Sequence, residues 1–332
     1  MNTKVSSVVA SLLLWPAVLA SCAEEPTARN ASVAELLEAL APEPVKVVLD
    51  AESGGEISGT GTRFLIPPGS IFLSGGQPAD LDTDGDGKAD SLRARGQVVV
   101  ELRELLTPEA MMNAGRPTVT TDGQLLESGG AFDLTITGDE GELLVTNLTD
   151  LVITPEAQPS NPDGMELWVA DTGAPRFGWE RPAAEPLLAQ REGQSFLLPN
   201  VPSSRINIPR PAKNIDVPRS NTPRLTTQAP VRVQVLGDEI SDAAVFFFPR
   251  GLFSVVRLER EARTDGMIFV APGSTLGESL TGSLVVVSRA GGLTLFERRE
   301  LALSAAPGGE RSIAVRPRPI TAAELARQLL PR

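Results

Sequence analysis

Apolar and polar residues alternate with a period of two along much of the chain after residue 44. The alternation is clearest at 98–103 and at 132–137, and clusters of glycine and aspartate separate such segments. Related patterns or short apolar runs recur at 231–235, 245–248, 268–270, 284–287, 293–295 and 313–315. A period of two with frequent turn signals indicates short antiparallel strands. We therefore predict a mainly β fold with two antiparallel β-sandwich-like domains.

Two short segments follow a helical pattern instead. Residues 32–35 read S-V-A-E and residues 321–324 read T-A-A-E, and both fit the capping box that begins a helix. Ile320 and Leu325 are spaced as a hydrophobic staple around the second box. The sequence thus predicts short helices near the N- and C-terminal ends of the β domains.

A short apolar leader precedes the single cysteine of the chain. Lys4 supplies a positive charge, an apolar run extends from 8 to 19, and small residues lead up to Cys22. This stretch resembles the lipobox of bacterial lipoproteins, which implies cleavage before Cys22, acylation (palmitate) there, and a membrane anchor at the cell envelope. Ala23 after the lipid site implies the outer membrane, by analogy with enterobacterial sorting. The alternative is a signal-anchor helix, although Pro16 interrupts a run shorter than the ~20 residues that a span needs.

Composition divides the chain into five segments. We expect a signal peptide over 1–21, a tether with a short helix over 22–43, a first β domain over 44–156, a Pro-rich and partly packed connector over 157–230, and a second β domain with a C-terminal helix over 231–332. Dense proline is typical of an extended connector. The aromatic stretches around Trp168 and Trp179 nevertheless indicate that part of the connector is buried.

Negative charge is concentrated in the first β domain. Residues 44–156 contain 7 basic and 19 acidic residues, whereas residues 157–332 contain 21 basic and 18 acidic ones. Such a field attracts cations and disfavours nucleic acid, so we expect no nucleic-acid partner.

The composition also restricts catalysis. The chain has no histidine and no tyrosine, and its one cysteine is assigned to lipid, so imidazole bases, Cys-His nucleophiles and histidine-bound zinc are excluded. We therefore expect a protein that is not an enzyme. A hydrolase that uses carboxylates, such as Glu101 with Glu104, remains a less favoured alternative.

The most distinctive polar motif is an acidic loop that reads D-T-D-G-D-G-K-A-D from residue 82. Carboxylates at alternate positions of a tight loop can converge on one Ca²⁺ ion and would repel one another without it. The expected ligands are the side chains of Asp82, Asp84, Asp86 and Asp90 and the backbone carbonyl of Lys88.

This loop resembles the calcium loops of EF-hands, dockerins and thrombospondin type 3 repeats. Arg93 stands at the twelfth position, where the family pattern has a bidentate acid. The departure implies weak affinity, with a Kd of ~10⁻⁴–10⁻³ M. The alternative is a solvated acidic turn without metal.

A second resemblance covers residues 45–156. An I-P-P-G-S-I turn at 66–71, a strand at 97–105 and L-E-S-G-G at 126–130 follow one another as in ZU5-type β-sandwiches and in bacterial surface lipoproteins with this arrangement. The resemblance implies an interaction or scaffolding module. A generic sandwich in which Pro-Pro-Gly simply turns the chain is the alternative.

These observations together predict a membrane-anchored envelope lipoprotein that binds or scaffolds without catalysis and carries a calcium-stabilised loop. Its expected partner is a protein or glycan at the cell surface. A carbohydrate-binding protein that stacks sugars on Trp168 or Trp179 is the alternative, although core packing explains both indoles as well.

Overall fold

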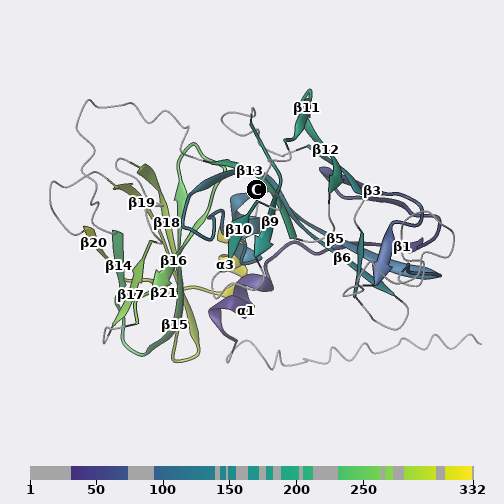
Figure 1. The fold of residues 1–332 in the computed structure, drawn as a ribbon. Helices are drawn as coiled ribbons and strands as arrows, with labels where there is room; N and C mark the ends of the chain where they lie inside the picture. The colour runs from purple at the N-terminus through teal and green to yellow at the C-terminus, as the bar shows by residue number, and fades with distance from the viewer. Residues whose placement is uncertain are drawn as a thin grey trace, which may run out of the picture.

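The alternating segments form strands in three sheets, arranged as two β units with short helices between them (Figure 1). This mainly β architecture confirms the predicted fold class. The computed structural model describes residues 31–73, 93–138, 143–146, 149–154, 164–171, 177–181, 188–201, 205–211, 231–262, 266–271, 280–303 and 311–330. No helix among these residues has the length and apolar character needed to cross a membrane.

The first unit consists of two sheets. The larger contains, in spatial order, β1 (Val45–Asp50), β5 (Gln97–Leu105), β6 (Leu126–Gly138), β13 (Arg205–Pro211), β9 (Trp168–Asp171) and β10 (Gly178–Glu180), and β7 (Leu143–Thr146) pairs with both β6 and β4 (Ile71–Leu73). The smaller contains β11 (Gln190–Glu192), β12 (Ser195–Val201), β8 (Thr149–Ile153), β3 (Thr62–Ile66) and β2 (Gly55–Ser58).

The two sheets of the first unit pack face to face. Val100 in β5 and Phe132 in β6 are fully buried, and so is Phe64 in β3 of the other sheet. The Phe64 and Phe132 rings meet edge to face at 6.1 Å between centroids. The period-two pattern of the sequence therefore places one side of each strand in a common core.

The Pro-Pro-Gly motif forms the turn between β3 and β4. Gly69 has a φ of 63°, a left-handed conformation that glycine adopts at little cost. The Ser70 hydroxyl donates to the Pro67 carbonyl at 2.7 Å, and Ile71 after the turn is fully buried. The motif thus reverses the chain and returns an apolar side chain to the core.

Much of the segment expected to be a connector, 157–230, forms strands of the first unit. Strands β9, β10 and β13 extend the larger sheet, and β11 and β12 extend the smaller one. Pro209 and Pro211 lie within β13, where the register against β6 shifts between Asn207 and Pro209. A strand tolerates proline at such an irregularity, so proline density alone did not mark an unpaired linker.

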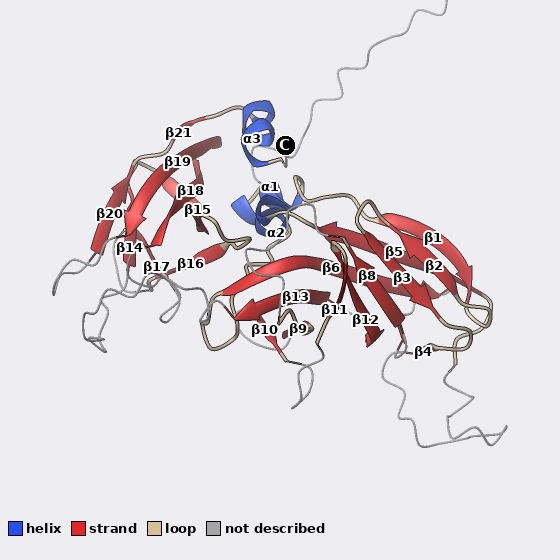
Figure 2. Cartoon of the chain, turned by 90° about the horizontal axis from the view of Figure 1, so that it is seen from above, coloured by secondary structure: helices blue, strands red, loops and turns tan. Residues whose placement is uncertain are grey.

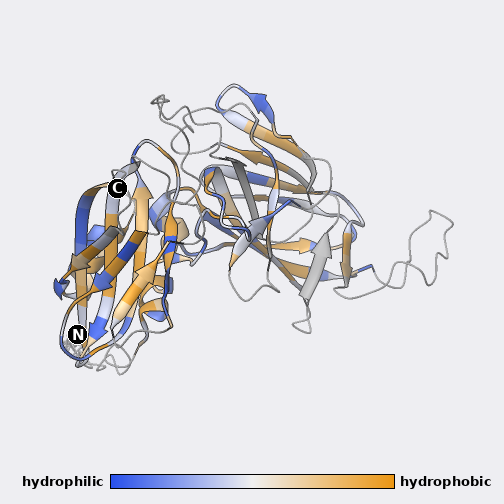
Figure 3. Cartoon of the chain, turned by 60° about the vertical axis from the view of Figure 1, so that its left-hand side comes forward, coloured by the Kyte–Doolittle hydropathy of each residue, from blue (hydrophilic) through white to orange (hydrophobic). Residues whose placement is uncertain are grey.

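The second unit is one curled sheet. Its spatial order is β20 (Arg311–Val315), β14 (Val231–Val235), β17 (Met267–Val270), β16 (Val256–Arg260), β15 (Ile240–Pro249), β18 (Leu280–Ala290), β19 (Leu293–Leu303) and β21 (Arg318–Pro319). The pairing of β14 with β20 is parallel, and the other pairings are antiparallel. Side chains from distant strands of the sheet, such as Val233, Phe247 and Val286, share one core. Figure 3 shows the apolar colouring that runs along the strands of both units.

Three described helices fill the space between the units (Figure 2). They are α1 (Val33–Glu38), α2 (Pro108–Asn113) and α3 (Ala322–Leu329). Both predicted capping boxes are confirmed, at Ser32 and at Thr321. The sequence analysis missed α2, although Thr107 at its N-cap and Pro108 after it are start signals.

The helices and both units share one apolar cluster, which we call the junction core. Its buried members include Leu37 of α1, Met111 and Met112 of α2, Leu126, Trp168 and Trp179 of the first unit, Phe246, Phe248, Val255 and Val287 of the second unit, and Leu325 and Leu329 of α3. Helices of six to eight residues are marginal alone and persist through such packing. The junction core therefore makes one body of the two β units.

Candidate functional site

The residues expected to carry the lipid and the calcium lie outside the described part of the chain. These are Cys22 and the loop residues Asp82, Asp84, Asp86, Lys88 and Asp90. Among the residues that the structure does describe, no group of three or more Cys, Asp or Glu side chains is arranged to hold a metal.

Trp168 packs beneath an arginine. Its side chain is 6 % exposed, and the Arg181 guanidinium lies 5.3 Å from the ring centroid. Two nitrogens of the Arg181 guanidinium donate to one oxygen of Glu166, Nε at 3.0 Å and Nη2 at 2.8 Å, which holds the cation over the indole. The Trp168 ring is therefore already covered by protein.

Trp179 is a core residue of the junction. It is 1 % exposed, its Nε1 donates to the Pro117 carbonyl at 2.8 Å, and its ring meets Phe177 edge to face at 5.1 Å. A sugar platform needs an open ring face, so these surroundings favour the core-packing interpretation of both tryptophans.

The acid pair considered for a hydrolase is separated. Glu101 and Glu104 are three residues apart in β5, so their side chains project from opposite faces of the sheet. Glu101 pairs with Lys46 at 2.7 Å, whereas Glu104 accepts hydrogen bonds from the backbone amides of Thr60 and Gly61 at 2.7 and 3.0 Å. Each carboxylate thus has its own structural partner.

A seam of hydrogen bonds joins the two units beside the junction core. The Thr118 amide donates to the Val255 carbonyl at 2.8 Å, and the Val255 amide donates to the Thr118 hydroxyl at 2.9 Å. The Ser128 amide donates to the Phe253 carbonyl at 2.9 Å. Thr118 and Ser128 are fully buried, so the seam is shielded from water. It fixes segment 117–128 of the first unit against 253–255 of the second.

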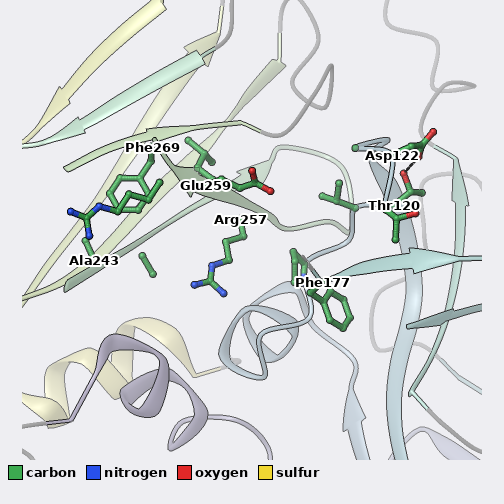
Figure 4. Close-up of a pocket in the computed structure, with 14 residues that line it drawn as sticks. Thr120, Asp122, Phe177, Ala243, Arg257, Glu259 and Phe269 are labelled. Atoms are coloured by element: carbon green, nitrogen blue, oxygen red, sulfur yellow. Dashed lines mark hydrogen bonds between the residues drawn. The ribbon is translucent and has the colours of Figure 1, made fainter. Parts of the chain in front are cut away.

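An open cavity of about 650 Å³ lies next to this seam (Figure 4). One wall comes from segment 117–123 and Phe177, and the other from β15, β16 and Phe269. The short side chains of Ala243 and Ala244 leave room beside β16. Its volume lies within the range of about 300–1,000 Å³ that small-molecule sites have, and its polar lining suits a polar ligand.

Four charged side chains line the cavity, and they differ in their partners. Arg257 and Arg260 form no hydrogen bond or ion pair with any described residue. Asp122 accepts a hydrogen bond from the Thr120 hydroxyl, and Glu259 takes part in an interaction of its own. Among the described residues that line the cavity, the two guanidinium groups are therefore charged donors without a protein partner.

Arg257 also borders a smaller cavity of about 330 Å³ between α1, α2 and the sheet. The acidic residues that line this smaller cavity already have partners. Asp242 accepts a hydrogen bond from the Val33 amide at 2.7 Å, and Glu38 forms an ion pair with Arg103. Glu35 accepts the Ser32 amide at 2.7 Å.

Sequence reasoning did not single out Arg257. In β16 it alternates with the buried residues Val256 and Leu258, which is the pattern of any half-buried strand. Its importance comes from Phe246, the opposite residue in β15, which points into the junction core and places Arg257 on the face toward the first unit. That relation depends on packing between distant segments.

The chain matches no protein-family model, and it matches no curated protein.

Proposed function

We propose that this chain is a lipid-anchored binding protein of the cell envelope that holds a ligand in the cavity between its two β units and releases it unchanged. One observation carries the proposal. The cavity walls come from two units that a buried seam and a common junction core hold together. A preformed cavity with fixed walls loses little freedom when a ligand enters, which favours binding.

The anchor rests on the sequence. Acylation of Cys22 after cleavage would attach the mature chain to a membrane, and several acyl chains on one residue suffice for stable anchoring. The test is palmitate labelling of cells that produce the wild-type chain or C22A. The proposal expects label and membrane association in the wild type alone. Equal labelling of C22A would contradict it.

The acidic loop and the ZU5-like order of motifs belong to the same proposal. A calcium ion held by Asp82, Asp84, Asp86, Asp90 and the Lys88 carbonyl would relieve repulsion within the loop and stabilise its fold. The ZU5-like interpretation of residues 45–156 agrees with a role in interaction, since it implies a scaffolding module without catalytic residues.

Binding at the cavity is tested with a substitution that fills it from an exposed position. Thr121 lies on the rim, and T121W should obstruct the cavity, whereas Q190W adds the same bulk at exposed β11. Soluble oligosaccharides and peptides are screened by ligand-observed NMR against the full chain in detergent. We expect a ligand that binds the wild type and Q190W, fails to bind T121W, and is recovered intact. Conversion of the ligand, or equal binding by T121W, would contradict the proposal.

A further inference from the structure

The strongest chemical signal in the cavity is Arg257, one of the two lining arginines that have no partner among the described residues. Arg116 in the same region pairs with Asp133 at 3.0 Å, and Arg181 pairs with Glu166 at 2.8 Å. Arg257 has no such contact with any described residue, although its exposed side chain projects into the cavity (Figure 4). Its guanidinium therefore keeps its donors available for a molecule that enters from solvent.

No described acid forms an ion pair with this cation, although the nearby carboxylates keep their charge. Asp122 is engaged by Thr120 and Glu259 has its own interaction. Asp242, on the side of the smaller cavity, accepts a hydrogen bond from the Val33 backbone amide of α1. These carboxylates nevertheless lower the local potential, which disfavours a dianion such as phosphate more than a single carboxylate.

The remaining wall suits a hydroxylated ring. Phe177 lines the cavity. The Arg116 guanidinium lies over one face of its ring, 5.2 Å from the centroid, and Trp179 meets the ring edge to face, so a ligand can contact only the part of the ring that borders the cavity. On the same side, the Thr120 hydroxyl is buried and bonded to Asp122 and to the Gln124 amide, whereas the exposed Thr121 hydroxyl, which donates to Glu180, and the Asp122 carboxylate can accept hydrogen bonds from ligand hydroxyl groups.

We infer that the cavity binds an acidic sugar, a uronic acid residue, with its carboxylate on Arg257 and its ring against Phe177. The planar guanidinium can donate two parallel hydrogen bonds to a carboxylate, and the Asp122 side would take the sugar hydroxyls. This inference rests on the proposed function, because it names the ligand class of the same cavity. It differs from the sugar-stacking alternative because neither buried tryptophan takes part.

The experiment is a calorimetric titration of the full chain in detergent with digalacturonic acid. The matched ligand is its methyl ester, in which each carboxylate becomes a neutral ester that carries one added methyl group. Inorganic phosphate and a tetraglutamate peptide are compared as well. The matched protein control is R299Q, since Arg299 is also exposed in a strand of the second unit and also has no described partner.

We expect R257Q to weaken binding of the uronate by about tenfold or more, with R257K intermediate and R299Q unchanged. The methyl ester should bind no better to the wild type than to R257Q. Equal affinity of R257Q and wild type, or tighter binding of phosphate or the peptide, would overturn the inference. If another ligand binds in a T121W-sensitive way while uronates do not, the proposed function stands and the ligand class is wrong.

Discussion

Glu104 joins the two sheets of the first unit through a single carboxylate. It projects from β5 of the larger sheet and accepts hydrogen bonds from the turn between β2 and β3 of the smaller one. Gly59 in this turn has no room for a side chain, since a Cβ there would lie 2.2 Å from the Glu104 carboxyl carbon. The Glu104 carboxylate can therefore reach the backbone amides of this turn only because residue 59 is a glycine.

The pKa of Glu104 predicts how stability changes with pH. Burial raises this pKa, but the hydrogen bonds from Thr60 and Gly61 lower it by more than burial raises it, so the pKa of the carboxyl lies below its ordinary value of 4.5. A lowered pKa stabilises the fold above the unfolded value and loses that effect as the pH falls through the folded value. We expect E104Q to reduce the free energy of unfolding by about 1–2 kcal/mol at pH 7, with a smaller difference below about pH 4.

The control for this prediction is E101Q. The Lys46–Glu101 pair is largely exposed, so its loss should cost less than about 1 kcal/mol. Urea unfolding at pH 7 and at pH 3 provides the comparison. A constant difference between E104Q and wild type at both pH values would show that the carboxylate charge is not involved.

Among the helices, α3 packs against the junction core through one apolar face and accepts a hydrogen bond from the side-chain amide of Asn113 in α2. Leu325 and Leu329 are buried in the junction core, and the Asn113 side chain of α2 donates to the Leu329 carbonyl at 3.2 Å. The same amide group donates to the Leu40 carbonyl just after α1. One side chain thus connects all three described helices.

Truncation of Leu329 should therefore destabilise the protein. We expect L329A to lower the free energy of unfolding by about 2–4 kcal/mol, because a fully buried leucine is replaced. The neighbouring variant L330A is the control, since Leu330 is 45 % exposed and should change stability by less than about 0.5 kcal/mol. Similar effects of the two variants in urea unfolding would place α3 outside the core.

The proposed calcium site in the acidic loop predicts that calcium raises the stability of the protein. If residues 82–90 bind calcium, free Ca²⁺ at ten times the Kd adds about 1.4 kcal/mol to stability and raises the Tm by roughly 2–5 °C. Calorimetry of the wild type and of D84N/D86N, with calcium or with a chelator, measures the shift. A Tm that does not respond to millimolar calcium would support the solvated acidic turn instead.

Local patterns predicted elements better than they predicted the arrangement. Alternation identified β5, β6 and most strands of the second unit, and both capping boxes identified helices. The strands between 168 and 211 were harder to predict, because short strands interrupted by proline lack a period and pair with the distant β6 and β8. The cavity could not be predicted, since its walls come from three segments that lie far apart in the sequence, around residues 117–123, 177 and 243–269.

At the scale of the whole molecule, the junction core predicts cooperative unfolding. Trp168 and Trp179 report on the junction by fluorescence, whereas far-UV circular dichroism reports on the strands of both units. We expect coincident urea transitions, and F246A in the second unit should shift both midpoints equally, because Phe246 packs in the shared core. Two separate transitions, or an F246A effect confined to one probe, would show that the units unfold independently.

One ligand that contacts both walls of the cavity should protect both walls, and hydrogen–deuterium exchange of the ligand-bound wild type measures this protection. We expect added protection in segment 117–123 of the first unit and in 256–260 of the second, with the same dependence on ligand concentration. Protection of one wall alone, or of a surface away from the junction, would contradict it.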